Sequence, residues 1–315
     1  MNEPTTAQSA AATAKILTLA AGVDLSSPGV RDDALTTLEG GGIVLLSGTG
    51  FELTASEAAL VGHLGAMLTN EPQVPDGRPT IIFDPARGGI KRYHFAYSRG
   101  KLVRAQLRPS ARPVIEAMMS RFGGWAEGLI GRLLPRYGTT LGRDRITYRP
   151  NPRGDVQPLH MDSSYGFPTQ GRGMLRVFCN IDPANRPRVW QVGEPFAPVA
   201  GRYVAALRPQ RPGLGSALLA RLGLLGGAQT AYDQMMADLR RLVKGDKQYQ
   251  REAPRRIVEF PTGSTWIALT DLVLHGAVSG QHSLDQTFYL PAAAMRDPAQ
   301  SSLHMLEQMT GQRLV

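Results

Sequence analysis

The sequence predicts an α+β fold: an all-β core with helical additions. The 315 residues include 35 Gly and 23 Pro, and the many turns that these imply suit short strands better than a helical bundle. Residues 173–183, GMLRVFCNIDP, alternate with the period of two that is typical of a strand. Residues 255–291 again read as strands separated by Gly and Ser turns. Since no repeat or clear linker interrupts the chain, we expect one domain.

The composition is ordinary for a globular protein, with 42% hydrophobic and 19% charged residues. A single cysteine, Cys179, excludes an intrachain disulfide and gives no reason to expect an oxidising compartment. The apolar run near the N-terminus is short and contains Lys15, so no signal peptide is expected. No run of about 18 apolar residues predicts a membrane span. We therefore expect a cytoplasmic protein.

The formal net charge of +9 favours anionic partners such as nucleic acid, anionic lipid or a phosphorylated substrate. A basic surface kept for solubility explains the charge equally well, because the Arg and Lys residues are scattered. The chain has no run of five basic residues, no RNA-binding aromatic signature and no Cys/His finger. Nucleic acid is therefore not an expected partner.

The N-terminal part is expected to contain few elements. Residues 1–35 form a partly ordered segment, and 40–48 form a buried strand between glycines. Residues 54–69 form a helix, for which Thr54 and Glu57 have the spacing of a capping box.

Turns and short strands are expected over 72–108, with a hairpin turn at SRGK. Residues 111–136 are then predicted as two helices separated at Gly123 and Gly124. A new strand is expected over 145–152.

The main domain is predicted to run over 36–295. Within it, residues 184–255 read as an insertion with helical patterns near 214–225 and 228–244. A C-terminal helix is expected within 296–315.

The segment LHMD suggests half of a metal site. Residues two apart in a strand point to the same side, so His160 and Asp162 would converge. A third ligand should come from a late strand, and TDLVLHG offers His275, which is followed by Gly276. Two histidines and one carboxylate form the facial triad that leaves positions open on Fe(II) for a cosubstrate and O₂.

The alternative for these residues is structural. His160 and Asp162 would then share a local hydrogen bond, and His275 would pack in the core. Among the other histidines, His282 reads as a loop residue, and His94 is the candidate for a substrate contact because it lies among aromatic residues.

Several segments together resemble a known family. They are LHMD, RGMLRVFCNIDP, PRVWQVGEPF and DLVLHGAVSGQHSLDQTFYLP. They are similar to the bacterial 3-deoxy-D-manno-oct-2-ulosonic acid (Kdo) hydroxylases, from about residue 36 to 295. The resemblance implies a double-stranded β-helix (jelly roll) with flanking helices. It also implies hydroxylation of Kdo, an acidic sugar of the lipopolysaccharide inner core, at C3.

The same resemblance implies the cofactors. His160, Asp162 and His275 would be the ligands of Fe(II), with 2-oxoglutarate and O₂ as cosubstrates and ascorbate as an accessory reductant. The protein would fix the coordination, orient the sugar and shield the site.

The sequence departs from the usual pattern at the 2-oxoglutarate site. Many dioxygenases of this fold place an Arg about ten residues after the last histidine, and HSLDQTF contains no cation. Arg176 is the substitute that we expect to bind the distal carboxylate, with Asn180 and Gln286 adding hydrogen bonds. The alternative for Arg176 is a strand arginine held in a salt bridge.

The stretch SSYGFPTQGRG also departs from the family pattern and predicts an altered contact with the substrate. Ser163, Tyr165 and Arg172 are the candidates there, while Arg188 and Trp190 are expected to contact the saccharide or a lipid headgroup. For the last two, packing of the insertion onto the core is an equal alternative.

Three functions remain open on the sequence. The first is an Fe(II)/2-oxoglutarate hydroxylase of Kdo or a related acidic sugar, either soluble or lipid-linked, with peripheral contact to the inner face of an anionic membrane. The second is a dioxygenase of the same type with another substrate. The third is a jelly-roll protein that binds anionic glycans without catalysis. The oligomeric state is not predicted.

Overall fold

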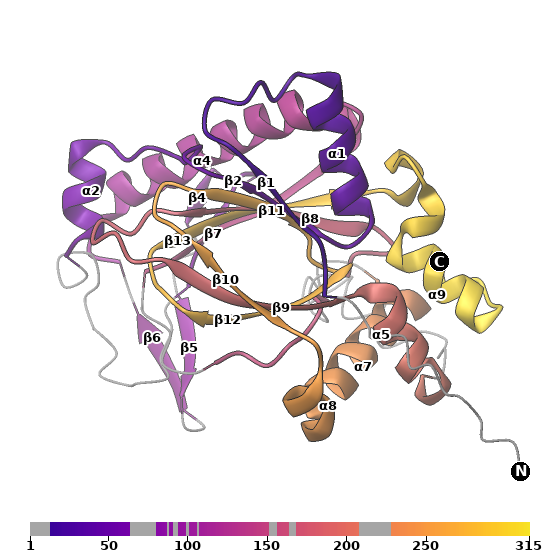
Figure 1. Cartoon of the computed structure of the whole chain (residues 1–315). Coiled ribbons are helices and arrows are strands. Elements are labelled where there is room, and N and C mark those ends of the chain that lie inside the picture. The colour runs from indigo at the N-terminus through magenta and orange to yellow at the C-terminus, as the bar shows by residue number, and fades with distance from the viewer. Residues whose placement is uncertain are drawn as a thin grey trace, which may run out of the picture.

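Two β-sheets face each other and helices cover the outside, as Figure 1 shows. The structure is a computed structural model that describes residues 13–63, 80–86, 88–90, 94–98, 101–105, 107–150, 156–163, 168–207 and 228–315. Within these ranges the predicted strand-rich core with helical additions is confirmed, and its two facing sheets form a jelly roll.

The large sheet has eight strands. Their spatial order is β1 (Ile16–Leu19), β2 (Ile43–Leu46), β11 (Thr265–Leu269), β8 (Gly173–Asn180), β13 (Ser283–Leu290), β7 (Gly142–Arg149), β3 (Ile81–Asp84) and β4 (Gly89–Ile90). β1 and β2 are parallel, and the other neighbours are antiparallel.

The small sheet has the order β10 (Arg256–Phe260), β9 (Arg188–Pro195) and β12 (Val273–Ser279), all antiparallel. A separate antiparallel pair joins β5 (His94–Ser98) to β6 (Lys101–Ala105), with Ser98 opposite Lys101, as expected of strands on either side of SRGK; residues 99 and 100 lie outside the described residues.

The helices form two groups (Figure 1). On the outer face of the large sheet lie α1 (Pro28–Glu39), α2 (Ala55–Val61) and α4 (Arg112–Leu133). At one end of the sandwich lie α5 (Phe196–Tyr203), α7 (Ala231–Gly245), α8 (Lys247–Glu252) and α9 (Ser302–Thr310). Short 3₁₀ turns occupy Gly138–Thr140, Val204–Ala206, Ala292–Ala294 and Pro298–Gln300. No helix in the described ranges combines the length and the apolar character that crossing a bilayer requires.

The space between the two sheets is filled by aromatic rings. Trp266 stacks on Phe260 with ring centroids 4.1 Å apart and on Phe178 at 5.3 Å, while Trp190 meets all three rings edge to face. These rings belong to β11, β10, β8 and β9, so this apolar core lies where the small sheet covers the large one.

Local sequence signals explain several elements. The capping box predicted at Thr54 and Glu57 is present and begins α2. The helix was predicted to continue to residue 69, but it ends at Val61 with Gly62 as its C-cap, and residues 64–69 lie outside the described residues. Cys179 is buried, as the alternation of its strand predicts.

The segment predicted as partly ordered over 1–35 contains β1, which pairs in parallel with β2, and α1, which begins at Pro28. Two predictions of the organisation were wrong. Residues 111–136 hold one helix, α4, and not two. The insertion does not begin at 184, because β9 pairs with β12 inside the small sheet. The additional helices follow β9, and the helix predicted near 214–225 lies outside the described residues.

Gly123 explains why α4 stays continuous. A Cβ atom there would lie 2.7 Å from Cδ1 of Ile146, a buried residue of β7. Glycine therefore lets the helix pack closely on the sheet and does not end it, whereas Gly124 is exposed and meets nothing within 4 Å.

This packing predicts opposite effects of the same substitution at adjacent positions. Gly124→Ala should stabilise the protein by up to about 1 kcal/mol through helix propensity. Gly123→Ala should destabilise it by about 1–3 kcal/mol because the added methyl overpacks the contact with Ile146. Urea denaturation of both variants measures the difference, and equal shifts would contradict this account of the helix.

Candidate active site

A reciprocal pair of backbone hydrogen bonds brings the two predicted histidine ligands together. The His160 amide donates to the His275 carbonyl at 3.0 Å, and the His275 amide donates to the His160 carbonyl at 2.9 Å. Residues opposite each other in such a pair point to the same face. Gly276 permits this approach, because a Cβ atom there would lie 2.4 Å from the carbonyl oxygen of Gln157.

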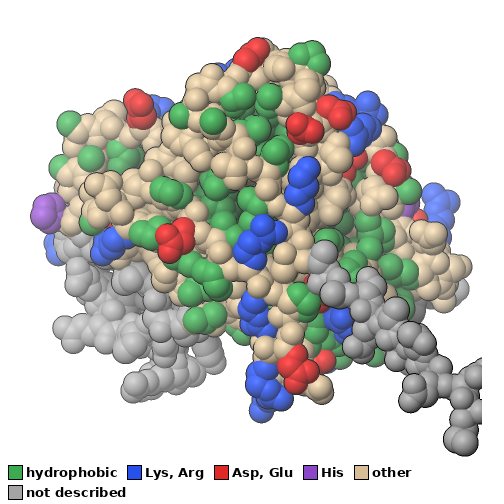
Figure 2. Space-filling view, in the orientation of Figure 1, with side chains coloured by type: hydrophobic (Ala, Val, Ile, Leu, Met, Phe, Trp, Pro, Cys, Tyr) green, Lys and Arg blue, Asp and Glu red, His purple; other side chains and the backbone are tan. Residues whose placement is uncertain are grey.

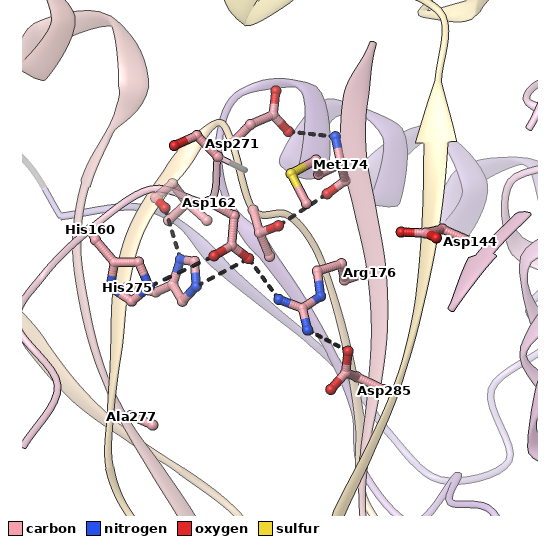
Figure 3. A network of polar contacts seen from close by, with 12 residues as sticks. Asp144, His160, Asp162, Met174, Arg176, Asp271, His275, Ala277 and Asp285 are labelled. Atoms are coloured by element: carbon pink, nitrogen blue, oxygen red, sulfur yellow. Dashed lines mark hydrogen bonds and ion pairs between the residues drawn. The ribbon is translucent and has the colours of Figure 1, made fainter. Parts of the chain in front are cut away.

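Asp162 completes the cluster from two residues further along the chain. Its amide donates to the Thr270 carbonyl at 2.8 Å, which fixes the segment beside the start of β12. Asp162 Oδ1 lies 3.7 Å from His160 Nε2, and Oδ2 lies 3.9 Å from His275 Nε2. Figure 3 shows the three side chains converging, and their ligand atoms all lie within 4.8 Å of one another.

The hydrogen bonds of the histidines suit metal binding. His160 Nδ1 lies 2.9 Å from the Pro158 carbonyl, and His275 Nδ1 lies 3.0 Å from the Val273 carbonyl. With Nδ1 as the donor, each Nε2 presents its lone pair toward Asp162. Gln157 Nε2 also lies 3.3 Å from His160 Nε2.

The charge states fit the same donor set. Burial lowers the pKa of His160 to about 3 and also lowers that of His275, so both imidazoles are neutral. Burial alone would raise the pKa of Asp162, but the positive charge of the Arg176 guanidinium holds it well below its usual value. Two neutral imidazoles and one carboxylate form a donor set that fits Fe(II).

A chain of buried charges supports Asp162. Arg176 donates to Asp162 Oδ2 at 2.7 Å and forms a second ion pair with Asp285, as Figure 3 shows. Asp285 is fully buried and pairs also with Arg149. Both terminal nitrogens of Arg176 thus pair with carboxylates, as the salt-bridge alternative for this residue predicts.

A cavity of about 290 Å³ opens beside the three ligands. Four arginines line it: Arg149, Arg176, Arg188 and Arg240. Its other walls include Phe178, Trp190, Trp266 and Ser283. Such a concentration of guanidinium groups around one carboxylate favours anionic ligands.

Two indole donors mark the wall of this cavity between the sheets. Trp190 stacks on His275 with ring centroids 5.0 Å apart, and Trp266 lies behind it. The Nε1–H groups of both are buried and have no hydrogen-bond partner among the described residues.

Two predicted cofactor contacts do not lie in this cavity. Asn180 is fully buried; its amide donates to the carbonyls of Arg186 and Phe260, and its oxygen accepts from the Asp182 amide. Gln286 points toward α4 and donates to the Asp144 carbonyl at 2.7 Å. Both are structural, because alternation predicts the face of a strand but not which residues satisfy its turns.

Some of the residues predicted to contact the substrate line the cavity beside the three ligands, and others do not. Arg188 and Trp190 line the cavity from β9, so they do not belong to a peripheral insertion. Arg172 instead packs its guanidinium on the Tyr289 ring and donates to the Thr169 carbonyl. Ser163 accepts from Arg240 through its carbonyl, at 2.7 Å.

Two further candidates are not tested. Tyr165 lies outside the described residues. His94 begins β5, but its side chain is not described.

Sequence reasoning missed Arg149, Asp285 and Arg240. Asp285 lies ten residues after His275, where many enzymes of this fold carry the arginine. An acidic residue at this position was a signal that neighbouring strands supply the positive charge, as Arg149 of β7 and Arg176 of β8 do. Arg149 lies within the strand predicted over 145–152 and is the last residue of β7. Arg240 lies on α7, and no local pattern distinguishes it from a surface arginine.

Comparison with known proteins agrees with this geometry. A family model described as 3-deoxy-D-manno-oct-2-ulosonic acid (Kdo) hydroxylase matches residues 23–313. The chain belongs to this family. No curated protein sequence matches the chain.

Solved structures of a Kdo hydroxylase, KdoO, are similar over 95% of this chain and 97% of theirs. KdoO is described as a non-heme Fe(II) alphaketoglutarate dependent dioxygenase. Its complex with succinate and Fe(III) has a TM-score of 0.80 at 30% identity, and its complex with alphaketoglutarate and Fe(III) has 0.79 at 30%. The apo structure has 0.80 at 29%.

His282 lies near the site but serves the fold. It is buried at a positive φ of 50°, and its Nδ1 lies 2.9 Å from the Tyr148 hydroxyl. Burial lowers its pKa to about 4. The unfolded chain therefore takes up this proton near pH 6.5, before the native protein does.

The shift predicts a loss of stability in acid that starts below pH 6.5 and is complete near pH 4. His282→Asn keeps a side chain that tolerates positive φ and removes the titration. The variant should lose about 1–3 kcal/mol less stability over this range than the wild type. Urea denaturation at a series of pH values tests this, and parallel curves would contradict it.

Proposed function

We propose that His160, Asp162 and His275 hold the Fe(II) of a 2-oxoglutarate-dependent dioxygenase that hydroxylates Kdo at C3. The chain is a Kdo hydroxylase by family, and Fe(II), 2-oxoglutarate and O₂ are the cofactor and cosubstrates that go with it. The observation that supports the site is the convergence of two neutral histidines and one ionised carboxylate within 4.8 Å.

Bound iron would supply the activation of O₂, coupled to the decarboxylation of 2-oxoglutarate. The protein's residues keep ligand positions open for these molecules. Arg176 holds Oδ2 of Asp162, so Asp162 offers the metal its other oxygen, Oδ1. A carboxylate that binds through one oxygen takes a single position.

Arg188 is the residue that we assign to the distal carboxylate of 2-oxoglutarate. It is 6% exposed, lines the cavity from β9 and is anchored by a 2.6 Å hydrogen bond from Nη1 to the Gly280 carbonyl. The aromatic rings of Trp190 and Trp266 line the same cavity. A guanidinium meets the needs of a carboxylate, and the aromatic walls exclude water.

Turnover of Kdo tests the function directly. The purified protein with Fe(II), 2-oxoglutarate and O₂ should yield succinate together with Kdo that has gained one oxygen atom, detected by mass spectrometry. His160→Ala should abolish both products, because a metal ligand is lost. The matched control His304→Ala, on α9, should keep both. Products that persist in His160→Ala would contradict the assignment.

Arg188 carries a separate prediction. Arg188→Gln should raise the KM for 2-oxoglutarate by about 10- to 100-fold, the scale of a lost charged hydrogen bond, and change kcat little at saturation. Arg186→Gln is the control, because Arg186 is half exposed and pairs with Asp182. An unchanged KM for 2-oxoglutarate in Arg188→Gln would contradict the assignment of Arg188 to its distal carboxylate.

We also propose that the sugar is presented on a lipid and that the enzyme works at the cytoplasmic face of an anionic membrane. The net charge of +9 supports this. Figure 2 shows Lys and Arg dispersed over the visible face in separate groups, which suits diffuse attraction to anionic lipid. Cosedimentation with anionic vesicles, and none with neutral ones, is the expected result.

A further inference from the structure

The inner face of the large sheet changes character from one side to the other. Over β2, β11 and β8 it is covered by the small sheet and is apolar. Beyond β8 lie β13, β7 and β3, whose inner face carries hydroxyl and charged groups. A second cavity of about 240 Å³ lies over this part.

The second cavity adjoins the first. Thr80, Arg149, Asp162 and Arg176 line both, so each has the predicted carboxylate ligand in its wall. Arg188, which we assign to the carboxylate of 2-oxoglutarate, lines the first cavity only. The second is therefore available to the other reactant.

An irregularity in β7 shapes the second cavity. Gln286 of β13 pairs with Ile146, but Phe288, two residues on, pairs with Arg143, three residues back. The extra residue is a β-bulge, a device that redirects side chains beside functional sites. In a regular strand two consecutive residues point to opposite faces. At the bulge, the consecutive residues Asp144 and Arg145 both line the cavity.

The bulge is held in place from both sides. Gln286 donates to the Asp144 carbonyl, and the Tyr289 hydroxyl donates to Asp144 Oδ2 at 2.8 Å. Arg145 Nε donates to the same carboxylate oxygen at 3.1 Å. The Asp144 carboxylate thus orients the Arg145 side chain, which is only partly buried.

We propose that this second cavity binds the acidic sugar, with Arg145 and Arg149 facing its carboxylate and Thr147 and Thr287 facing its hydroxyls. The proposal rests on the proposed function and names the substrate subsite within it. Two guanidiniums match a carboxylate, and a row of threonine hydroxyls on one sheet face matches a polyol. The sugar would then lie beside Asp162, in the cavity next to the one assigned to 2-oxoglutarate.

The test separates sugar binding from cofactor binding. Under anaerobic conditions, Fe(II) and 2-oxoglutarate are added first and their visible charge-transfer band is recorded, and then Kdo is titrated. Arg145→Gln should raise the Kd for Kdo by about 10-fold or more while the band and the Kd for 2-oxoglutarate stay unchanged. Thr147→Val, which removes only a hydroxyl, should weaken Kdo binding in the same direction.

Arg143→Gln is the matched control. Arg143 lies on the same strand but pairs with Glu127 of α4, and its side chain is 63% exposed. It should leave both Kd values unchanged. If Arg145→Gln and Thr147→Val keep the Kd for Kdo within twofold, or if they weaken 2-oxoglutarate instead, the subsite is wrong. Failure of the band in the wild type would instead contradict the proposed function.

Discussion

The backbone pairing of His160 with His275 is the constraint on which the site depends. It joins the segment before Asp162 to β12 and sets both imidazoles on one face, 115 residues apart in sequence. The jelly roll supplies this proximity through β9, which fixes β12 on its other edge. A metal site held by strands and not by loops has ligands whose directions are set before the metal binds.

Charge balance is the second constraint. Burying Asp162 beside two neutral histidines is costly, and Arg176 offsets that cost. Arg176 is in turn balanced by Asp285, and Asp285 by Arg149. The acid at position 285 thus replaces the expected arginine without removing positive charge from the cavity, because guanidinium groups arrive from β7, β8, β9 and α7 instead. This redistribution leaves guanidinium groups in the walls of both cavities.

The sequence predicted the strand-rich fold and the three candidate ligands, because a period of two and an HxD pair are local patterns. It failed where long-range packing decides. Gly123 was taken for a helix break although it is a contact point with Ile146, and Asn180 was placed in the cavity although its amide closes a turn. The roles of Arg176 and Arg188 depend on which carboxylates lie near them. Strand pairing determines those neighbours, and local sequence does not reveal them.

The most direct measurement is an anaerobic titration of the metal-free protein with Fe(II), followed by 2-oxoglutarate, with the visible absorption recorded. The account predicts stoichiometric iron binding and a metal-to-ligand charge-transfer band on adding 2-oxoglutarate, with both lost in His275→Ala. Iron binding without the band would contradict the cavity assigned to 2-oxoglutarate. The absence of iron binding in the wild type would contradict the triad itself.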